Sequence, residues 1–339
     1  MQRVALLILL LILLLEGRTQ GPRTPRPPEN MILTATPLPL DPGDPARRRL
    51  GDLVYLGGWA LTSSSDSFGG ISSMRISDAG DVLALSDAGE RIEFSAGGFA
   101  KGRLRSRALM RFVPTLPTER LAPASRWDTE SMAWDPSTGM SWVGFEGYHR
   151  ICRYTRAFGA VSRCAKPPAV RAWPHNTGME SLARLPDGRF VTIAEEAPGP
   201  AGWGHDILVF PGDPVDPDTA PPARLTYVAP PGYLPTDALW IGPGRMVVLN
   251  RRVTLAEGFT AVVTLLDIRD LRPGRVLEGR VVARLTGSVP HDNFEALALS
   301  REGDTAILWV ASDDNHLMVQ RTLLLKFALP PAWTASHAD

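Results

Sequence analysis

Residues 179–195 read MESLARLPDGRFVTIAE, and their plan recurs along the chain. An acidic residue, Glu180, opens a short apolar stretch, a Gly-containing turn follows, and a second apolar stretch ends at Glu195. Short runs of β-branched and aromatic residues punctuated by Pro and Gly are typical of β-strands. This segment therefore predicts a β-hairpin with an acidic residue at the start of its first strand and another at the end of its second.

Four further segments share this plan. Aligned on the position of Glu180, successive segments are 61, 50, 57 and 58 residues apart. The aligned positions are Gly69, Glu130, Glu180, Asp237 and Glu295. A period of this length suits a four-stranded β-propeller blade, whereas ankyrin and tetratricopeptide repeats are near ~33 residues. Since no stretch shows a sustained helical apolar period, a helical solenoid is excluded.

The repeats predict an all-β fold, a single β-propeller over residues 49–329 with a tail at 330–339. Five blades follow from the repeat count, or six if the Met31–Leu40 segment contributes another. Only three strands follow Glu295, the last at Leu323–Phe327. We expect Leu53–Leu61 to supply the fourth strand, so that the two ends of the chain close the ring without an open sheet edge.

The N-terminus predicts export. Met1-Gln2-Arg3 precedes an unbroken run of twelve apolar residues from Val4 to Leu15. As a helix this run would span about 18 Å, short of the ~30 Å hydrocarbon core of a bilayer. Residues 1–20 are therefore expected to be a secretory signal peptide or, because Glu16–Gln20 lacks a small-x-small cleavage pattern, an N-terminal membrane anchor. Residues 21–48 are expected to be a Pro-rich linker without packed structure, and the protein to be periplasmic or secreted.

Two cysteines lie symmetrically about Phe158-Gly159. If a hairpin turns near Gly159, Cys152 and Cys164 come opposite each other on adjacent strands, where an oxidising compartment can join them. The alternative is two unlinked thiols. The sequence has no CxxC motif and no Cys/His cluster with zinc-type spacing.

Composition and missing motifs exclude several functions. The 339 residues include 36 basic and 36 acidic ones, so the basic excess of a nucleic-acid-binding domain is missing and no such partner is expected. A hydrophobic content of 44% with 21% charged residues fits neither a disordered chain nor a multi-span membrane protein. No GxSxG motif is present, which excludes an ordinary serine esterase of the α/β-hydrolase type, and no P-loop occurs.

The aligned acidic residues predict the site. In a propeller the first strand of each blade lines the central channel, so Glu130, Glu180, Asp237 and Glu295 are expected to form a partial acidic ring. A second set recurs where the second strand ends, and it comprises Asp87, Glu146, Glu195 or Glu196, Asn250 and Asp313. Converging carboxylates raise each other's pKa unless a cation compensates them, and oxygen ligands suit Ca²⁺ or Mg²⁺ better than zinc. The alternative is structural, with each acid hydrogen-bonded to the backbone of the next blade.

These positions lead to specific roles. We predict Glu130, Glu180 and Glu295 to be ligands or catalytic bases. The predicted metal ligands are Asp87, Glu146, Asp237 and Asp313. His291 precedes Glu295 by four residues and is a candidate general base. Arg251 and Arg252 follow Asn250, where they could clamp a phosphate or carboxylate group or, alternatively, form a structural ion pair.

Several motifs together resemble the bacterial phytase-like family, whose domain is described as "esterase-like activity of phytase". The most specific are Asp292-Asn293-Phe294-Glu295-Ala296-Leu297, Ser312-Asp313-Asp314-Asn315 and Gln320–Leu325, with supporting matches at Asp128–Ser131 and Gly178–Leu182. The likeness runs from about Leu53 to Phe327. It implies an exported β-propeller with phosphoester or ester hydrolase activity. The chain departs from the family at Ala296, where Gly is common, and at Asp237, where Glu is common.

Three functions remain open. The first is a metal-assisted hydrolase of small phosphoester or ester substrates, with Ca²⁺ held by channel carboxylates. The second is a non-catalytic propeller of the cell envelope that binds a ligand at the channel mouth. The third is a lactonase similar to the gluconolactonase group. In each case we expect a monomer.

Overall fold

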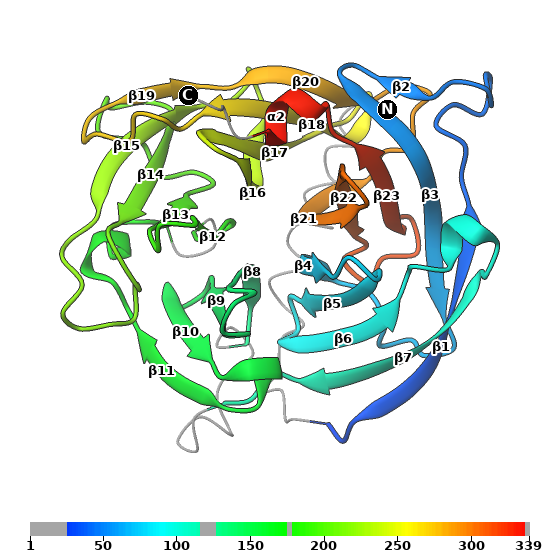
Figure 1. Cartoon of the computed structure of the whole chain (residues 1–339), viewed down its shortest axis with the longest axis horizontal. Helices are drawn as coiled ribbons and strands as arrows, with labels where there is room; N and C mark the ends of the chain where they lie inside the picture. The colour runs from blue at the N-terminus through cyan, green and yellow to red at the C-terminus, as the bar shows by residue number, and fades with distance from the viewer. Residues whose placement is uncertain (1–25, 116–126, 175–177, 336–339) are drawn as a thin grey trace.

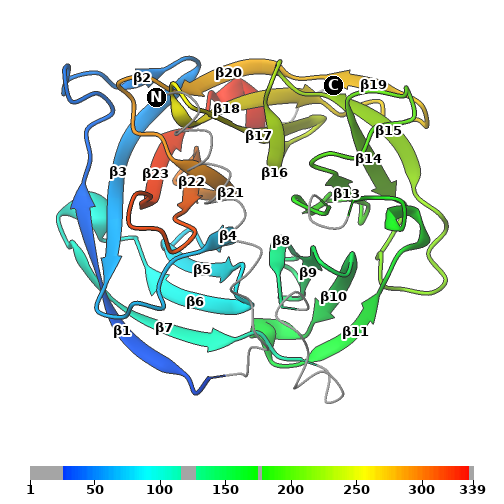
Figure 2. The same cartoon turned by 180° about the vertical axis from the view of Figure 1, so that it is seen from behind.

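The computed structural model describes residues 26–115, 127–174 and 178–335. Strands dominate these ranges, and the one α-helix described, α2 (Pro331–Thr334), is a single turn. The expected all-β class is therefore confirmed. The strands are arranged around a central axis in a propeller-like fold (Figures 1 and 2). Within the described ranges, no helix has the length and apolar character needed to cross a bilayer.

The strands form units of four that follow one another around the axis. The first comprises β4 (Ile71–Ile76), β5 (Asp81–Ser86), β6 (Glu90–Ser95) and β7 (Arg105–Phe112). The second comprises β8 (Thr129–Trp134), β9 (Ser141–Phe145), β10 (Arg150–Tyr154) and β11 (Val161–Ala165). The third comprises β12 (Ala183–Arg184), β13 (Phe190–Ile193), β14 (His205–Phe210) and β15 (Ala223–Val228), with β19 (Val276–Glu278) added in parallel at its edge.

Two further units complete the molecule. The fourth comprises β16 (Leu234–Gly242), β17 (Arg245–Thr254), β18 (Gly258–Asp267) and β20 (Arg280–Leu285). The fifth comprises β21 (Asn293–Glu302), β22 (Thr305–Asp313), β23 (Thr322–Ala328) and β3 (Leu53–Ser63), with β2 (Arg49–Leu50) beside β3. The fifth unit thus takes its outer strand from the N-terminal part of the chain, with Thr322 opposite Leu61 and Ala328 opposite Val54. The predicted pairing of the strand after Leu53 with the last strand of the chain is confirmed.

The segment expected to be an unstructured linker instead contains a strand, β1 (Glu29–Pro37). It pairs with β3 on one side and with β7 on the other, so the fifth and first units share one ten-stranded sheet. Met31, Leu33 and Ala35 alternate with more exposed residues and are buried, which is the pattern of a half-buried strand. The prediction was wrong because the prolines on both sides of this alternation dominated the composition. The expected signal or anchor at residues 1–20 lies outside the described residues.

The segment after residue 329 was expected to be a tail, and its first part is packed. Trp333 in α2 is buried in the apolar cluster that includes Ile241, Leu308 and Phe327. An indole ring buries a large apolar area, so this single turn is held to the fold by its aromatic residue. Residues 336–339 lie outside the described ranges.

The innermost strands contact one another in sequence around the axis. β4 contacts β8, β8 contacts β12, β12 contacts β16, β16 contacts β21, and β21 contacts β4. Small hydroxyl side chains on these strands bond across the junctions: Ser72 donates to the carbonyl of Thr129, and Ser131 donates to that of Met179 at 2.8 Å. Thr236 likewise donates to the carbonyl of Phe294 at 3.1 Å. Buried backbone acceptors at these three junctions are thereby satisfied by a neighbouring unit.

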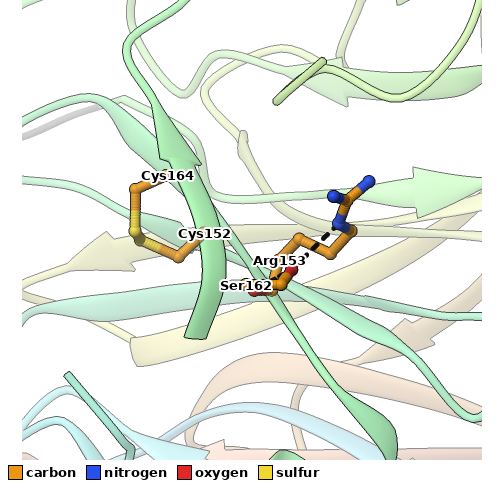
Figure 3. The surroundings of a disulfide bond; sticks show 4 residues. All are labelled: Cys152, Arg153, Ser162 and Cys164. Atoms are coloured by element: carbon orange, nitrogen blue, oxygen red, sulfur yellow. Dashed lines mark hydrogen bonds between the residues drawn. A yellow bond between two sulfur atoms is a disulfide. The ribbon is translucent and has the colours of Figure 1, made fainter. Parts of the chain in front are cut away.

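The predicted disulfide is present. Cys152 on β10 and Cys164 on β11 are directly opposite in register and are joined by a disulfide bond (Figure 3). The neighbouring pair adds a hydrogen bond between the same strands, from Nε of Arg153 to the hydroxyl of Ser162 at 3.0 Å. The outer strand of the second unit is therefore tied covalently to the strand inside it.

Candidate functional site

The starts of the inner strands carry a repeated irregularity. In β8 the register passes from Thr129 to Ser131, and in β21 it passes from Phe294 to Ala296. Glu130 and Glu295 are therefore each the unpaired residue of a β-bulge. A bulge turns the side chain of its extra residue away from the normal alternation and is common next to active sites. The same kind of β-bulge therefore sets the direction of both glutamate side chains.

The same bulge corrects the alignment of two other repeats. In β4 the skipped residue is Ser72, and in β16 it is Thr236. The structural equivalents of Glu130 are thus Ser72 and Thr236, and the positions aligned by sequence, Gly69 and Asp237, are displaced. Asp237 accepts hydrogen bonds from the backbone N–H groups of Ala238 and Leu297, each at 2.7 Å. This side chain therefore links β16 to β21, which is the structural alternative considered above.

Three acidic side chains meet closely enough to hold a cation. Carboxylate oxygens of Asp128, Glu130 and Glu146 all lie within 4.8 Å of one another. Asp128 and Glu130 are half-buried and Glu146 is buried. The hairpin of β8 and β9 brings them together, because the backbone N–H of Glu146 donates to the carbonyl of Asp128 at 3.0 Å. Asp128 was not among the predicted ligands, although its place two residues before Glu130 was the available signal.

Beside this trio lies a second group of charges around Arg251. Its Nη2 donates to Glu195 at 2.8 Å, and its Nη1 donates to Glu295 at 2.5 Å. Nη1 also donates to the side-chain oxygen of Asn293 at 2.7 Å, and Nδ2 of Asn293 donates to Glu295 at 2.9 Å. Asn293 therefore orients both partners, a role that sequence reasoning missed. Its position in the Asp292-Asn293 pair was the only hint.

Arg252 does not share this environment. Adjacent residues of a strand point to opposite faces, so Arg252 turns away from Arg251. Its Nη2 is paired with Glu257 on the same hairpin, and its guanidinium lies 4.7 Å from the ring centre of Tyr233. Of the two predicted clamp residues, the structure brings only Arg251 to the acidic group.

Burial and mutual repulsion raise the pKa of these carboxyl groups. Burial, followed by the charges of Asp128 and Glu180, places the pKa of Glu130 well above its usual range. Burial and the charge of Asp128 raise the pKa of Glu146 to about 8. The pKa of Glu180 is also well above its usual range, because it is buried and faces Glu195 and Glu146. The side chain of Glu180 lowers the pKa of Glu146 and so opposes part of the increase caused by burial.

Arg251 counteracts this effect on its own side of the cluster. Burial raises the pKa of Glu295 to about 7, while Arg251 and then Asn293 oppose the increase. Burial also raises the pKa of Glu195, again against the opposing charge of Arg251. The site therefore combines carboxyl groups whose pKa is far above the usual range with others in which Arg251 opposes the increase.

The other side chains predicted for the site are those of Asp87, Asp313 and His291. Asp313 is buried, and its pKa is well above the usual range because of burial and the charges of Glu295 and Asp87. Asp87 and Asp313 thus belong to the same electrostatic group, on the side of Glu295. His291 instead lies 2.6 Å, through Nδ1, from the carbonyl of Val289, and among the described residues it has no recorded contact with a carboxylate.

The comparisons with known proteins place the chain in a family. A family model described as "Phytase-like: Esterase-like activity of phytase" matches residues 66–316. No curated protein matches the sequence. Among solved structures, a gluconolactonase from Xanthomonas campestris is similar at 14% identity and a TM-score of 0.41, covering 92% of this chain and 99% of that one.

Two larger solved proteins are similar over part of their length. The hydrazine synthase of Kuenenia stuttgartiensis aligns at 13% identity and a TM-score of 0.37, over 75% of this chain. This chain spans only 59% of that protein's length. The dihydro-heme d1 dehydrogenase NirN aligns at 13% identity and a TM-score of 0.35, over 91% of this chain and 76% of that one.

Proposed function

The chain belongs to the phytase-like family, and from this premise we propose that it is a metal-assisted hydrolase of small phosphoester or ester substrates. The observation that carries the proposal is the meeting of Asp128, Glu130 and Glu146 within 4.8 Å, next to the Arg251 group. The charges of Glu180 and Glu295 also act on Glu130, so the two groups form one electrostatic unit. Perturbed carboxyl groups concentrated at one place are typical of functional sites.

For the architecture we propose a five-bladed propeller closed by β3. The circular order of contacts among β4, β8, β12, β16 and β21 supports five blades. The pairing of β3 with β23 supports closure by strands from both ends of the chain. In such a ring the bulged glutamates at the starts of inner strands face the central channel, which accounts for their mutual repulsion.

A divalent cation fits the donor set of the trio. All its side-chain donors are carboxylate oxygens, which suit Ca²⁺ or Mg²⁺ and disfavour softer metals. We propose that Asp128, Glu130 and Glu146 hold the cation, with Ca²⁺ the leading candidate. When bound, such an ion polarises a phosphoryl or acyl oxygen and activates water. A cation there also offsets the repulsion that otherwise raises the pKa of Glu130 and Glu146.

The other residues of the site have separate proposed tasks. Glu295 has a pKa of about 7 and is oriented by Asn293 and Arg251, so it is suited to accept a proton from water near neutral pH. Burial and the charges of Glu195 and Glu146 raise the pKa of Glu180 well above its usual range, and we propose that Glu180 carries a proton next to Glu146. Arg251 is occupied by two carboxylates, so its proposed task is to position Glu295 and Glu195 rather than to clamp the substrate.

The disulfide supports an oxidising compartment, and we propose that the protein is periplasmic or secreted. Membrane attachment through residues 1–20 and a monomeric state also remain proposals. Each can be measured directly, by fractionation of cells that express the full chain and by light scattering of the purified protein.

The decisive experiment is an assay with p-nitrophenyl phosphate, p-nitrophenyl esters, phytate and gluconolactone, in Ca²⁺ and in EDTA. We expect Ca²⁺-dependent turnover of a phosphoester or ester that falls at least a hundredfold in Glu130→Gln, since general acid–base and metal roles each contribute about 10²–10⁴-fold. Glu278→Gln is the matched control, because Glu278 is an exposed acid on β19. Turnover confined to gluconolactone would favour the lactonase alternative. An absence of turnover, with a ligand-induced rise in melting temperature, would favour a binding propeller.

A further inference from the structure

A hollow of about 760 Å³ opens on the face of the first unit that is turned toward the second. Its floor is formed by β4 to β7, and Trp134 and Ala157 of the second unit contribute to its wall. The two units also pack against each other, since Leu85 lies in one apolar cluster with Tyr154 and Phe158. None of the acidic residues of the Asp128–Glu130–Glu146 trio or of the Arg251 group lines this hollow. It is therefore a separate feature of the molecule.

The hollow is lined by more arginines than acids. Arg75, Arg91, Arg107 and Arg111 belong to its lining, against the two acids Asp81 and Glu93. The alternation of β7 explains the arrangement. Ala108 and Met110 are buried in the core, so Arg107 and Arg111 are exposed on the opposite face.

Two of these arginines, Arg91 and Arg111, face each other across neighbouring strands although both carry a positive charge. Arg91 on β6 lies directly opposite Arg111 on β7, and like charges in that relation destabilise a sheet. The side chain of Arg75 is stacked over Trp134, with its guanidinium carbon 4.6 Å from the ring centre. Burial lowers the pKa of Arg75 and of Arg91; the charge of Glu93 opposes this decrease in both, and a neighbouring arginine adds to it.

The described residues of the protein supply carboxylate partners for only some of these arginine charges. Nε of Arg91 lies 3.0 Å from Glu93, and its Nη1 donates to the carbonyl of Ala157 at 2.8 Å. Among the described residues, Arg75, Arg107 and Arg111 are in no ion pair. Burial of a cation is costly unless an anion pairs with it, so the buried Arg91 and the half-buried Arg75, next to the exposed Arg107 and Arg111, favour an anionic occupant.

We propose that this hollow binds a small polyanion that carries at least two phosphate or sulfate groups. Arginine suits such groups because its planar fork can donate two parallel hydrogen bonds to one tetrahedral anion. Arg107 and Arg111 are four residues apart on one strand, a separation of about 13 Å at 3.3 Å per residue. A ligand that contacts both arginines along this strand is therefore expected to be extended and to present anionic groups at more than one point.

The test is calorimetric titration of the full chain with two probes, a short linear polyphosphate and a sulfated heparin tetrasaccharide. We expect saturable binding of at least one probe, and the identity of that probe distinguishes a phosphate ligand from a sulfated sugar. Arg107→Gln and Arg111→Gln should each weaken binding roughly tenfold, because a charge-assisted hydrogen bond is stronger than a neutral one. Each variant should also reduce the dependence of affinity on salt concentration.

Two control variants make the result decisive. Arg163 is an exposed arginine on β11, paired in register with Arg153, which is itself bound to Asp213 between β14 and β15 of the third unit. Arg163→Gln should leave the affinity unchanged. Glu130→Gln should also leave it unchanged, because that residue lies in the acidic trio rather than in the hollow. Failure of both probes to bind would overturn the proposal, as would equal weakening by Arg163→Gln or loss of binding in Glu130→Gln.

Discussion

Nη1 of Arg251 lies 2.5 Å from Oε1 of Glu295, within a group of carboxyl groups that otherwise repel one another. The same guanidinium reaches Glu195 through Nη2 at 2.8 Å. Its side chain is 23% exposed, whereas those of Glu195 and Glu295 are 7% and 13% exposed. Arg251 is therefore the cation that opposes the increase in the pKa of two mostly buried glutamates.

Replacement of Arg251 should destabilise the fold. We expect Arg251→Met to lower the free energy of unfolding at pH 7 by about 2–4 kcal/mol, since removal of one member of a buried ion pair leaves an uncompensated charge. The loss should shrink at pH 5, where the two glutamates take up protons. Urea unfolding at both pH values measures this. Arg252→Gln is the matched control and should cost under about 1 kcal/mol, because Arg252 pairs with the exposed Glu257. Equal losses in both variants would contradict the assigned role.

Stability should depend on pH in a direction opposite to that of most acidic groups. The pKa of Glu146 rises from 4.5 to about 8 on folding, and that of Glu295 rises from 4.5 to about 7. Between these values the folded chain binds more protons than the unfolded chain, so the stability they contribute is complete below pH 4.5 and is lost as the pH rises to 8. In EDTA we expect the free energy of unfolding to fall from pH 5 to pH 8.

Calcium should remove this dependence, because a bound cation favours the ionised carboxylates. Urea unfolding at pH 5, 6, 7 and 8, with EDTA and with Ca²⁺, tests both halves of the prediction. A free energy of unfolding that increases with pH in EDTA would show that these glutamates are ionised without the metal.

Asp237 should prove structural. Asp237→Ala removes the acceptor of two backbone hydrogen bonds and should cost about 2–3 kcal/mol of stability. The affinity of the Asp237→Ala variant for Ca²⁺, measured by calorimetry, should match that of the parent protein. Asp267→Ala is the control, because Asp267 is exposed and pairs with Arg269 within the same turn. A large loss of Ca²⁺ affinity in the Asp237→Ala variant would contradict this structural role and show that Asp237 is a metal ligand.

The disulfide should contribute measurable stability. Cys152 and Cys164 are twelve residues apart, and a loop of this size restricts the unfolded chain enough to stabilise the fold by about 2–3 kcal/mol. Both reduction with dithiothreitol and the double variant Cys152→Ala/Cys164→Ala should therefore lower the urea midpoint. The double variant should no longer respond to dithiothreitol. A parent protein whose midpoint is insensitive to the reductant would contradict this prediction.

The sequence supports the prediction of features that depend on period and symmetry. The spacing of the repeats predicts propeller-like units, and the shortage of strands after Glu295 predicts the contribution of β3. The symmetry of Cys152 and Cys164 about one turn predicts their pairing. Such features depend on the regular alternation of strands and turns, which is visible in the pattern of apolar and turn-forming residues in the sequence.

Side-chain positions that change when a strand shifts by one residue in register could not be predicted from the sequence. The bulge that aligns Thr236 rather than Asp237 with Glu130 shifts the strand by one position, and an acid adjacent to the correct position looks equivalent in sequence. The position of Arg251 among the glutamates depends on contacts between distant units. β1 was missed because its five alternating residues lie between prolines.

The strand order of the fifth unit has a consequence for biogenesis. β3 precedes the first four units in the chain and pairs with β23, which follows them, so its hydrogen-bonding edge must wait until those units have been synthesised. Assembly of this unit is therefore a late, non-local step, of the kind that slows folding. Ala328 and Val54 lie opposite each other although they come from opposite ends of the described chain, so this pairing cannot begin as a local hairpin.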